Sequence, residues 1–258
     1  MVDSKPSKWL SANYRLLLVG VLIIAAFLRL YALNNESPPG LEHDEVAHWL
    51  INREILNGEH GIYFSGAYGH EAAYHYLQTG FMLLLGDNAF ALRLPSVFLG
   101  LLLIAVSFTL ARRLFGLNTA VASAALLAVL FWPVFYSRLG LRATALPVLS
   151  GLSAYFWWRG WSDYYNQPSH LSAGQKTMSG SKGGAVPNSN GAAMLWFALC
   201  GVFAGLSFYT YMASRVVPIF FALFLIYLVL FLRSELRIRW RGVLLFFGVL
   251  VVVEFALA

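Results

Sequence analysis

The run LLLVGVLIIAAFLRLYAL, residues 16–33, decides the fold class of this chain. Its one charged residue is Arg29, and a helix of about 20 mostly apolar residues is long enough to cross a bilayer. Lys5, Lys8 and Arg15 precede the run, as in a signal sequence, but no small-residue cleavage pattern follows it. The sequence therefore predicts that residues 16–33 form an uncleaved first transmembrane helix.

Apolar runs of the same kind recur along the rest of the chain. They cover residues 90–110, 119–135, 143–158, 193–212, 216–232 and 243–258. The chain is 59% hydrophobic and 12% charged, whereas a soluble domain has about 45–50% apolar and about 25% charged residues. The sequence thus predicts an all-α polytopic membrane protein with about seven transmembrane helices, and it excludes a water-soluble fold.

Basic residues indicate how the chain is oriented, because Lys and Arg near the ends of a span resist translocation. With a cytoplasmic N-terminus, the inside set is Lys5, Lys8, Arg15, Arg112, Arg113, Arg159, Lys176, Lys182, Arg233, Arg237, Arg239 and Arg241. The outside set is Arg53, Arg93, Arg138, Arg142 and Arg215. The larger inside set predicts a multi-pass protein of the inner cell membrane whose N-terminus is cytoplasmic.

This orientation divides the chain into six segments. They are a cytoplasmic N-terminus (1–15), the first span (16–33), an extracytoplasmic catalytic loop (34–88), spans two to four (89–161), a flexible cytoplasmic loop (162–192) and spans five to seven (193–258). The cytoplasmic loop includes SGSKGGAVPNSNG, which is typical of a solvated linker. The last run reaches the chain end without a polar flank, so we expect either that the protein ends inside a membrane helix or that the chain is an N-terminal fragment or truncated product.

The net charge of +6 and the single cysteine exclude several kinds of site. The basic residues lie beside apolar runs and do not cluster on a polar surface, so no nucleic-acid partner is expected. Cys200 lies within an apolar run and has no second cysteine with which to form a disulfide or a thiolate metal site.

Titratable residues are concentrated in the loop at 34–88. It holds the acidic residues Glu36, Glu42, Asp44, Glu45, Glu54, Glu59, Glu71 and Asp87, and the histidines His43, His48, His60, His70 and His75. A loop that only connects two spans needs neither this length nor this chemistry. The loop is therefore the predicted functional region.

Two segments of the loop have helical spacing. DEVAHWLINREILN, residues 44–57, and HEAAYHYLQTGFMLLLG, residues 70–86, are the predicted helices. Their apolar stripes are Val46, Trp49, Leu50, Ile55 and Leu56 in the first, and Tyr74, Leu77, Phe81 and Leu84 in the second. Such stripes favour helices that lie on the membrane surface.

Each predicted helix starts with a carboxylate followed four residues later by a histidine, Asp44 with His48 and Glu71 with His75. This spacing places each pair on one helix face, where it could hold a divalent metal, orient a base or form a hydrogen bond. The carboxylates also fit a helix N-terminus electrostatically. His43 and His48 are five positions apart, unlike the histidines of a zincin, and no cofactor is certain.

Asp44 and Glu45 are the candidate catalytic residues. Adjacent carboxylates allow one to act as a base while the other positions a substrate or cation. A solvated helix start explains the same two residues, and spacing alone does not decide between these readings.

Several motifs resemble the GT-C glycosyltransferases, and in particular the bacterial protein-mannosyltransferase-like and aminoarabinose-transferase-like enzymes. They are PPGLEHDEVAHW (38–49), GHEAAYHYLQ (69–78), LLGDNAFALRLPSVFLG (84–100), YSRLGLRATALPVLSGLSAYFWWRG (136–160) and GVFAGLSFYTYMASRVVP (201–218). The resemblance implies a multi-span enzyme that moves a sugar from a polyprenyl-phosphate donor to an acceptor hydroxyl on a lipid, glycan or protein.

The resemblance also implies roles for individual residues. Asp44 matches the family's loop aspartate, implied to act as base, and Glu45 matches the acidic residue that often follows it. The expected substrate-binding residues are His43, His70, Glu71, Arg93, Arg138 and Arg142. The three arginines could meet the donor phosphate, or they could extend their charged ends to the membrane interface. Where the aminoarabinose transferases have Lys-Pro-Pro, this chain has His70, Glu71, Ala72 and Ala73.

Two other classes of protein compete with an enzyme. A transporter or lipid flippase would place ionisable residues near the bilayer midplane, but the only charged residues deep in predicted spans are Arg29 and Glu254, and each lies toward one end of its span. A structural scaffold explains the spans but not the loop. The sequence therefore favours a membrane glycosyltransferase.

Overall fold

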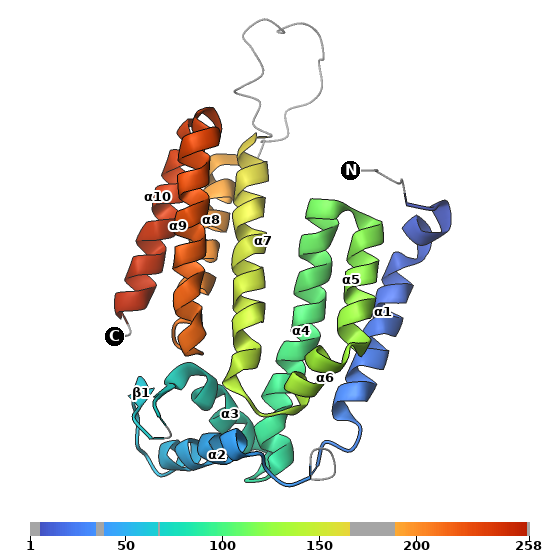
Figure 1. Cartoon of the computed structure of the whole chain (residues 1–258), viewed down its shortest axis with the longest axis vertical. Helices are drawn as coiled ribbons and strands as arrows, with labels where there is room; N and C mark the ends of the chain where they lie inside the picture. The colour runs from blue at the N-terminus through green and yellow to red at the C-terminus, as the bar shows by residue number, and fades with distance from the viewer. Residues whose placement is uncertain (1–5, 35–38, 67, 166–188, 257–258) are drawn as a thin grey trace, which may run out of the picture. The chain divides into compact units, whose positions relative to one another are not determined.

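A computed structural model describes residues 6–34, 39–66, 68–165 and 189–256. Its described part is helical except for one short hairpin (Figure 1). The chain divides into two compact units, one of Met1–Gly151 with Leu206–Arg215 and one of Leu152–Gly205 with Val216–Leu257. Most of the predicted cytoplasmic loop, residues 166–188, lies outside the described residues.

The long helices of the first unit begin and end at residues suited to those positions. They are α1 (Lys8–Leu30), α4 (Ala89–Phe115), α5 (Leu117–Val129), α6 (Phe131–Arg138) and the start of α7 (Ala145–Tyr165). The side chains of Ser7 and Asn88 accept hydrogen bonds from the first turns of α1 and α4. Gly116 joins α4 to α5 at a φ of 88°, a left-handed conformation that favours glycine.

A buried arginine stabilises the break between α5 and α6. The two helices meet at a bend of 55°, and such a break leaves carbonyl groups at the end of α5 without helical partners. Arg29, from α1, donates to the carbonyls of Leu127 and Ala128 at 3.0 and 3.1 Å, and to the hydroxyl of Ser137 at 3.0 Å. The hydrogen-bond acceptors of the Arg29 guanidinium thus lie within the first unit.

The second unit combines the rest of α7 with three further helices. These are α8 (Ser189–Ser207), α9 (Val216–Phe231) and α10 (Arg233–Ala256). Trp157, Phe197 and Phe246 lie in its core, where Trp157 contacts both phenylalanine rings edge to face. Arg239 is also buried, where it stacks on Trp161 and donates to that residue's carbonyl.

Three described helices are long and apolar enough to cross a membrane, and the bent pair α5 and α6 would make a fourth span. The three are Lys8–Leu30, Ala89–Phe115 and Met212–Phe231, the last formed by a 3-10 turn (Met212–Arg215) and α9. Large apolar side chains of α1 and α9, such as Leu16, Ile23 and Phe220, are more than half exposed. A bilayer solvates such surfaces, so the chain is a multi-pass membrane protein.

Helices occupy all seven predicted span positions, but a count of seven spans is not established. α7, α8 and α10 do not qualify as candidate spans, and the described part of α8, Gly191–Ser207, is apolar but shorter than the others.

Candidate active site

The loop between α1 and α4 folds into two helices and a hairpin, which lie together at one end of α4 (Figure 1). The elements are α2 (His43–Leu56), β1 (Tyr63–Phe64), β2 (His70–Glu71) and α3 (Ala72–Leu85). The predicted second helix began two residues too early, because His70 and Glu71 pair with Phe64 and Tyr63 in the hairpin. Gly69 permits this turn, since a Cβ there would overlap the Tyr63 hydroxyl.

Each of the two loop helices buries several polar side chains and exposes several apolar ones. In α2 the buried polar side chains are Glu45, His48 and Asn52, and in α3 they are His75, Gln78 and Thr79. Val46, Leu50, Leu77 and Leu84 are exposed as the predicted stripes require. Tyr74 and Ile55 are not on those stripes, because each is nearly fully buried. Both helices also bury apolar side chains, among them Ile51 and Met82, so the interior of the folded loop is mixed.

Glu45 forms a fully buried ion pair with Arg93 of α4. Its two carboxylate oxygens lie 2.8 Å from Nε and Nη2 of Arg93, and both side chains are 0% exposed. Glu45 also accepts from the backbone N–H of Gly140 at 2.8 Å and of Glu42 at 3.0 Å. Arg93 donates further to the carbonyls of Leu33 and Gly40. Both oxygens of Glu45 are therefore occupied by protein groups.

Gln78 connects the loop helices to the rest of the first unit. Its amide nitrogen donates to the carbonyls of Leu92 and Gly140, at 2.9 and 2.8 Å. These two acceptors fix the amide orientation, so its oxygen must accept from His48 Nδ1 at 3.1 Å and from Asn52 at 3.3 Å. Gln78 was not among the predicted site residues.

Three histidines converge beneath the hairpin. His48, His70 and His75 are all buried, and one ring nitrogen from each lies within 4.8 Å of the others. His75 Nε2 is 3.0 Å from His70 Nδ1, and His75 Nδ1 is 3.0 Å from the side-chain oxygen of Asn52. Burial lowers the pKa of His48 to about 3 and that of His75 to about 2, because desolvation disfavours the charged ring.

Asp44 differs from Glu45 in being open to solvent. Its side chain is 77% exposed, and its carboxylate lies 3.5 Å from His43, which is 94% exposed. Asp44 is still close enough to His48 to raise that residue's pKa, against the larger effect of burial. The predicted pairing of Asp44 with His48 as metal ligands is not formed, because one faces solvent and the other is buried.

Glu71 and Arg142 form a second ion pair, which is partly accessible. The Nη1 of Arg142 lies 2.6 Å from the Glu71 carboxylate, and the two side chains are 15% and 12% exposed. The Arg142 guanidinium lies over the ring of Tyr211, 5.5 Å from its centroid. Arg142 lowers the pKa of both His48 and His75, so its charge acts on the histidine group. Glu71 therefore pairs with Arg142 and does not join the histidines.

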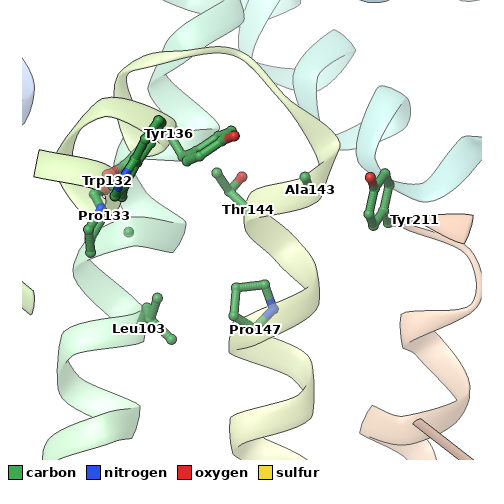
Figure 2. A pocket seen from close by; sticks show the side chains of 10 residues that line it. Leu103, Trp132, Pro133, Tyr136, Ala143, Thr144, Pro147 and Tyr211 are labelled. Carbon is green, nitrogen blue, oxygen red and sulfur yellow. The ribbon is translucent and has the colours of Figure 1, made fainter. Parts of the chain in front are cut away.

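A mainly apolar cavity of about 380 Å³ lies beside this ion pair (Figure 2). Its lining residues are Gly100, Leu103, Trp132, Pro133, Tyr136, Ser137, Ala143, Thr144, Pro147 and Tyr211. Figure 2 shows Leu103 and Pro147 between two helices, with Trp132 and Tyr136 on one side and Tyr211 on the other. Tyr211 connects the cavity to the ion pair, because its ring also contacts Arg142.

The three predicted phosphate-binding arginines thus have different environments. Arg93 is 0% exposed within the Glu45 pair, and Arg138 donates to the Leu28 carbonyl at the end of α1, at 2.7 Å. Arg142 directly precedes Ala143, which lines the apolar cavity, and it stacks on Tyr211, which lines the cavity as well. A ligand phosphate could reach Arg142 without breaking a fully buried ion pair.

Asn52, Gln78 and Gly140 are the site residues that sequence reasoning missed. Glu45, His48 and Asn52 recur at helical spacing, as do His75, Gln78 and Thr79. Two polar stripes were therefore readable from the sequence, although their mutual contacts were not.

Comparison with known proteins agrees with this architecture. Residues 70–173 match the family profile described as dolichyl-phosphate-mannose-protein mannosyltransferase. No curated protein sequence matches the chain.

Two solved structures share the fold. One is the protein O-mannosyltransferase complex of S. cerevisiae bound to the sugar donor, with 17% identity, a TM-score of 0.67 and coverage of 98% of this chain and 35% of that chain. The other is ArnT from Cupriavidus metallidurans bound to undecaprenyl phosphate, with 19% identity, a TM-score of 0.60 and coverage of 96% and 42%. The chain therefore spans well under half the length of either. The chain therefore shares the fold of these two enzymes, and residues 70–173, less than half of its length, match the mannosyltransferase profile.

Proposed function

We propose that this chain contributes to sugar transfer from a polyprenyl-phosphate donor to an acceptor hydroxyl at the extracytoplasmic membrane surface. The observation that carries the proposal is the mainly apolar cavity beside the Glu71–Arg142 pair. The exposed Asp44 is close to this region, because both Asp44 and Arg142 act electrostatically on His48. A lipid-linked sugar phosphate needs an apolar site for its first isoprene units, a cation for its phosphate and a base for the acceptor.

Arg142 is assigned to the donor phosphate. A guanidinium matches phosphate oxygens in geometry and charge, and Arg142 is held in place by Glu71 and Tyr211. Glu71 offsets part of its charge in the absence of donor. We assign His70 and His43 to the binding of donor and acceptor. Arg93 positions the loop through Glu45, and Arg138 positions α1 through the Leu28 carbonyl.

Asp44 is assigned as the base. Its carboxylate takes the proton from the acceptor hydroxyl while the hydroxyl oxygen forms a bond to the anomeric carbon. The bond from that carbon to the phosphate oxygen breaks, and the polyprenyl phosphate leaves with the electron pair. Glu45 cannot take this proton without breaking its pair with Arg93, so we assign it a positioning role.

We propose seven membrane spans, a cytoplasmic N-terminus and an extracytoplasmic loop at 34–88, in the inner cell membrane. A transporter is disfavoured by Arg29, whose guanidinium donates to carbonyl and hydroxyl oxygens within the first unit. An arginine held in this way stabilises a helix break and does not form part of a substrate path.

A transfer assay in membranes tests the assignment. Membranes carrying the wild-type chain or Asp44→Asn are given radiolabelled polyprenyl-phosphate sugars, and label in lipid, glycan and protein fractions is counted. A general base is worth about 10²–10⁴ in rate, so Asp44→Asn should lose that factor. Glu59→Gln, which changes an exposed carboxylate elsewhere in the loop, is the matched control. Equal transfer by Asp44→Asn and wild type would contradict the base assignment, and no transfer by wild type would contradict the function.

A further inference from the structure

We infer that His48, His70 and His75 form a binding site for one divalent first-row metal ion, with Zn²⁺ as the best-fitting ion. Neutral imidazoles suit Zn²⁺, and three histidines with one open position are a known ligand set for it. Their ligand nitrogens lie within 4.8 Å of one another. Nitrogens bound to one tetrahedral Zn²⁺ are separated by about 3.3 Å, as Zn–N bonds of about 2.0–2.1 Å require, so modest side-chain movement closes the site.

The hydrogen bonds around two of these rings determine which nitrogen carries the proton. Gln78 presents its oxygen to His48 Nδ1, which must therefore donate, and this leaves the lone pair on Nε2. Asn52 uses its amide nitrogen toward Gln78 and presents its oxygen to His75 Nδ1, with the same result. Both rings are held in the tautomer in which Nε2 can bind a metal.

The side-chain oxygens of Gln78 and Asn52, which accept from His48 and His75, are a second observation that is independent of the spacing of the rings. Metal-bound histidines usually donate their other ring N–H to a carboxylate, carbonyl or similar acceptor, which fixes the ring orientation. Asn52 and Gln78 do this for His75 and His48, and both amides are fully buried. A histidine cluster that served only to fill space would not need two buried amides.

The surrounding charges permit a cation. Arg142 is the nearby positive group, and Glu71 pairs with it at 2.6 Å. Asp44 contributes negative charge to His48. Phe64 and Tyr74 pack edge to face against the rings of His75 and His48 and limit the access of water. With three neutral ligands the ion would keep its full charge, and its fourth position would favour water or an anionic oxygen.

Metal binding by the full-length chain tests the inference without any sugar donor. Purified protein in detergent is stripped with a chelator, equilibrated with Zn²⁺ or Co²⁺ and desalted, and bound metal per chain is measured by mass spectrometry. We expect about one ion per wild-type chain and, with Co²⁺, visible absorption bands of a tetrahedral site. Wild-type protein that binds no stoichiometric metal overturns the inference, whatever the variants do.

Variants locate the site. His48→Gln and His75→Ala should lose the ion, whereas His60→Ala, which changes an exposed loop histidine, should keep it. Asn52→Ala leaves all three ligands in place and should weaken metal affinity by about 10–100-fold. Size-exclusion profiles show whether each variant is folded. Equal metal content in His75→Ala and wild type means a hydrogen-bonded histidine cluster with adventitious metal elsewhere, and it refutes the site. The result is independent of the transfer assay, so either proposal can fail alone.

Discussion

Glu45 and Asp44 are neighbours in the chain, but the fold gives them opposite environments. Glu45 is enclosed with Arg93, while Asp44 faces solvent. Burying an ion pair costs solvation, and removing one partner leaves an uncompensated charge. Position along the helix therefore separates the buried carboxylate from the exposed one.

Glu45→Gln should destabilise the first unit by about 3–5 kcal/mol, because Arg93 would stay buried without its counter-charge. Thermal unfolding in detergent measures this, with Glu59→Gln expected to unfold like wild type. An unchanged midpoint for Glu45→Gln would show that the pair does not hold the loop to α4.

The buried histidines predict a loss of stability in acid. The pKa of His48 and His75 is lowered to about 3 and about 2 in the folded state, while the unfolded rings titrate near about 6.5. Below about pH 6.5 these two rings take up protons in the unfolded state but not in the folded state. Each ring should then lower the free energy of unfolding by about 1.4 kcal/mol per pH unit, down to its folded pKa. Chelator-treated protein unfolded between pH 7 and pH 5 tests this, and His48→Gln should show a shallower dependence.

At the scale of elements, α1, α4 and α6 approach closely around Gly100. A Cβ there would lie 2.5 Å from Ser137 Cβ and 3.1 Å from Arg29 Nε. Gly100→Ala should therefore destabilise the protein by about 1–3 kcal/mol, as overpacking does.

Gly20→Ala is the matched control for Gly100→Ala, since a Cβ at residue 20 meets nothing within 4 Å. Alanine should be neutral or slightly stabilising there, because it favours the helix. Equal melting temperatures for the two variants would contradict the close approach at Gly100.

Helix positions were largely predictable from apolar periodicity, and their ends were not. Residues 44–57 were predicted helical and α2 covers His43–Leu56. The hairpin was missed because strands of two residues have no alternating pattern. The span predicted at 119–135 runs through the break after Val129, because composition alone does not show that Arg29 satisfies the freed carbonyls.

The candidate site was predictable as a region and less so as a set of contacts. The loop at 34–88 follows from its composition, because most of the chain's acidic residues and histidines lie there. The partners of Glu45, at Arg93 and Gly140, are 48 and 95 positions away. Sequence spacing reports neighbours within one helix, so it could not separate Glu45 from Asp44 or add His70 to the histidine group.

At the scale of the whole molecule, the proposed topology places the loop on the extracytoplasmic side of the membrane and the α9–α10 junction on the cytoplasmic side. Glu59→Cys and Ser234→Cys are both at exposed positions, and the native Cys200 is buried. A membrane-impermeant thiol reagent should label Glu59→Cys in intact cells and Ser234→Cys only after permeabilisation. Labelling in the opposite order would reverse the orientation derived from the basic residues.

The α5–α6 break also has a consequence for biosynthesis. Arg29 enters the membrane with α1, but the carbonyl of Leu127 and the hydroxyl of Ser137 are 98 and 108 positions later in the chain. Until they are synthesised, the guanidinium has no tertiary acceptor and must remain near the lipid headgroups. We therefore expect the first helix to reach its final depth only after α5 and α6 have been inserted, so that Arg29 couples the insertion of α1 to that of later helices.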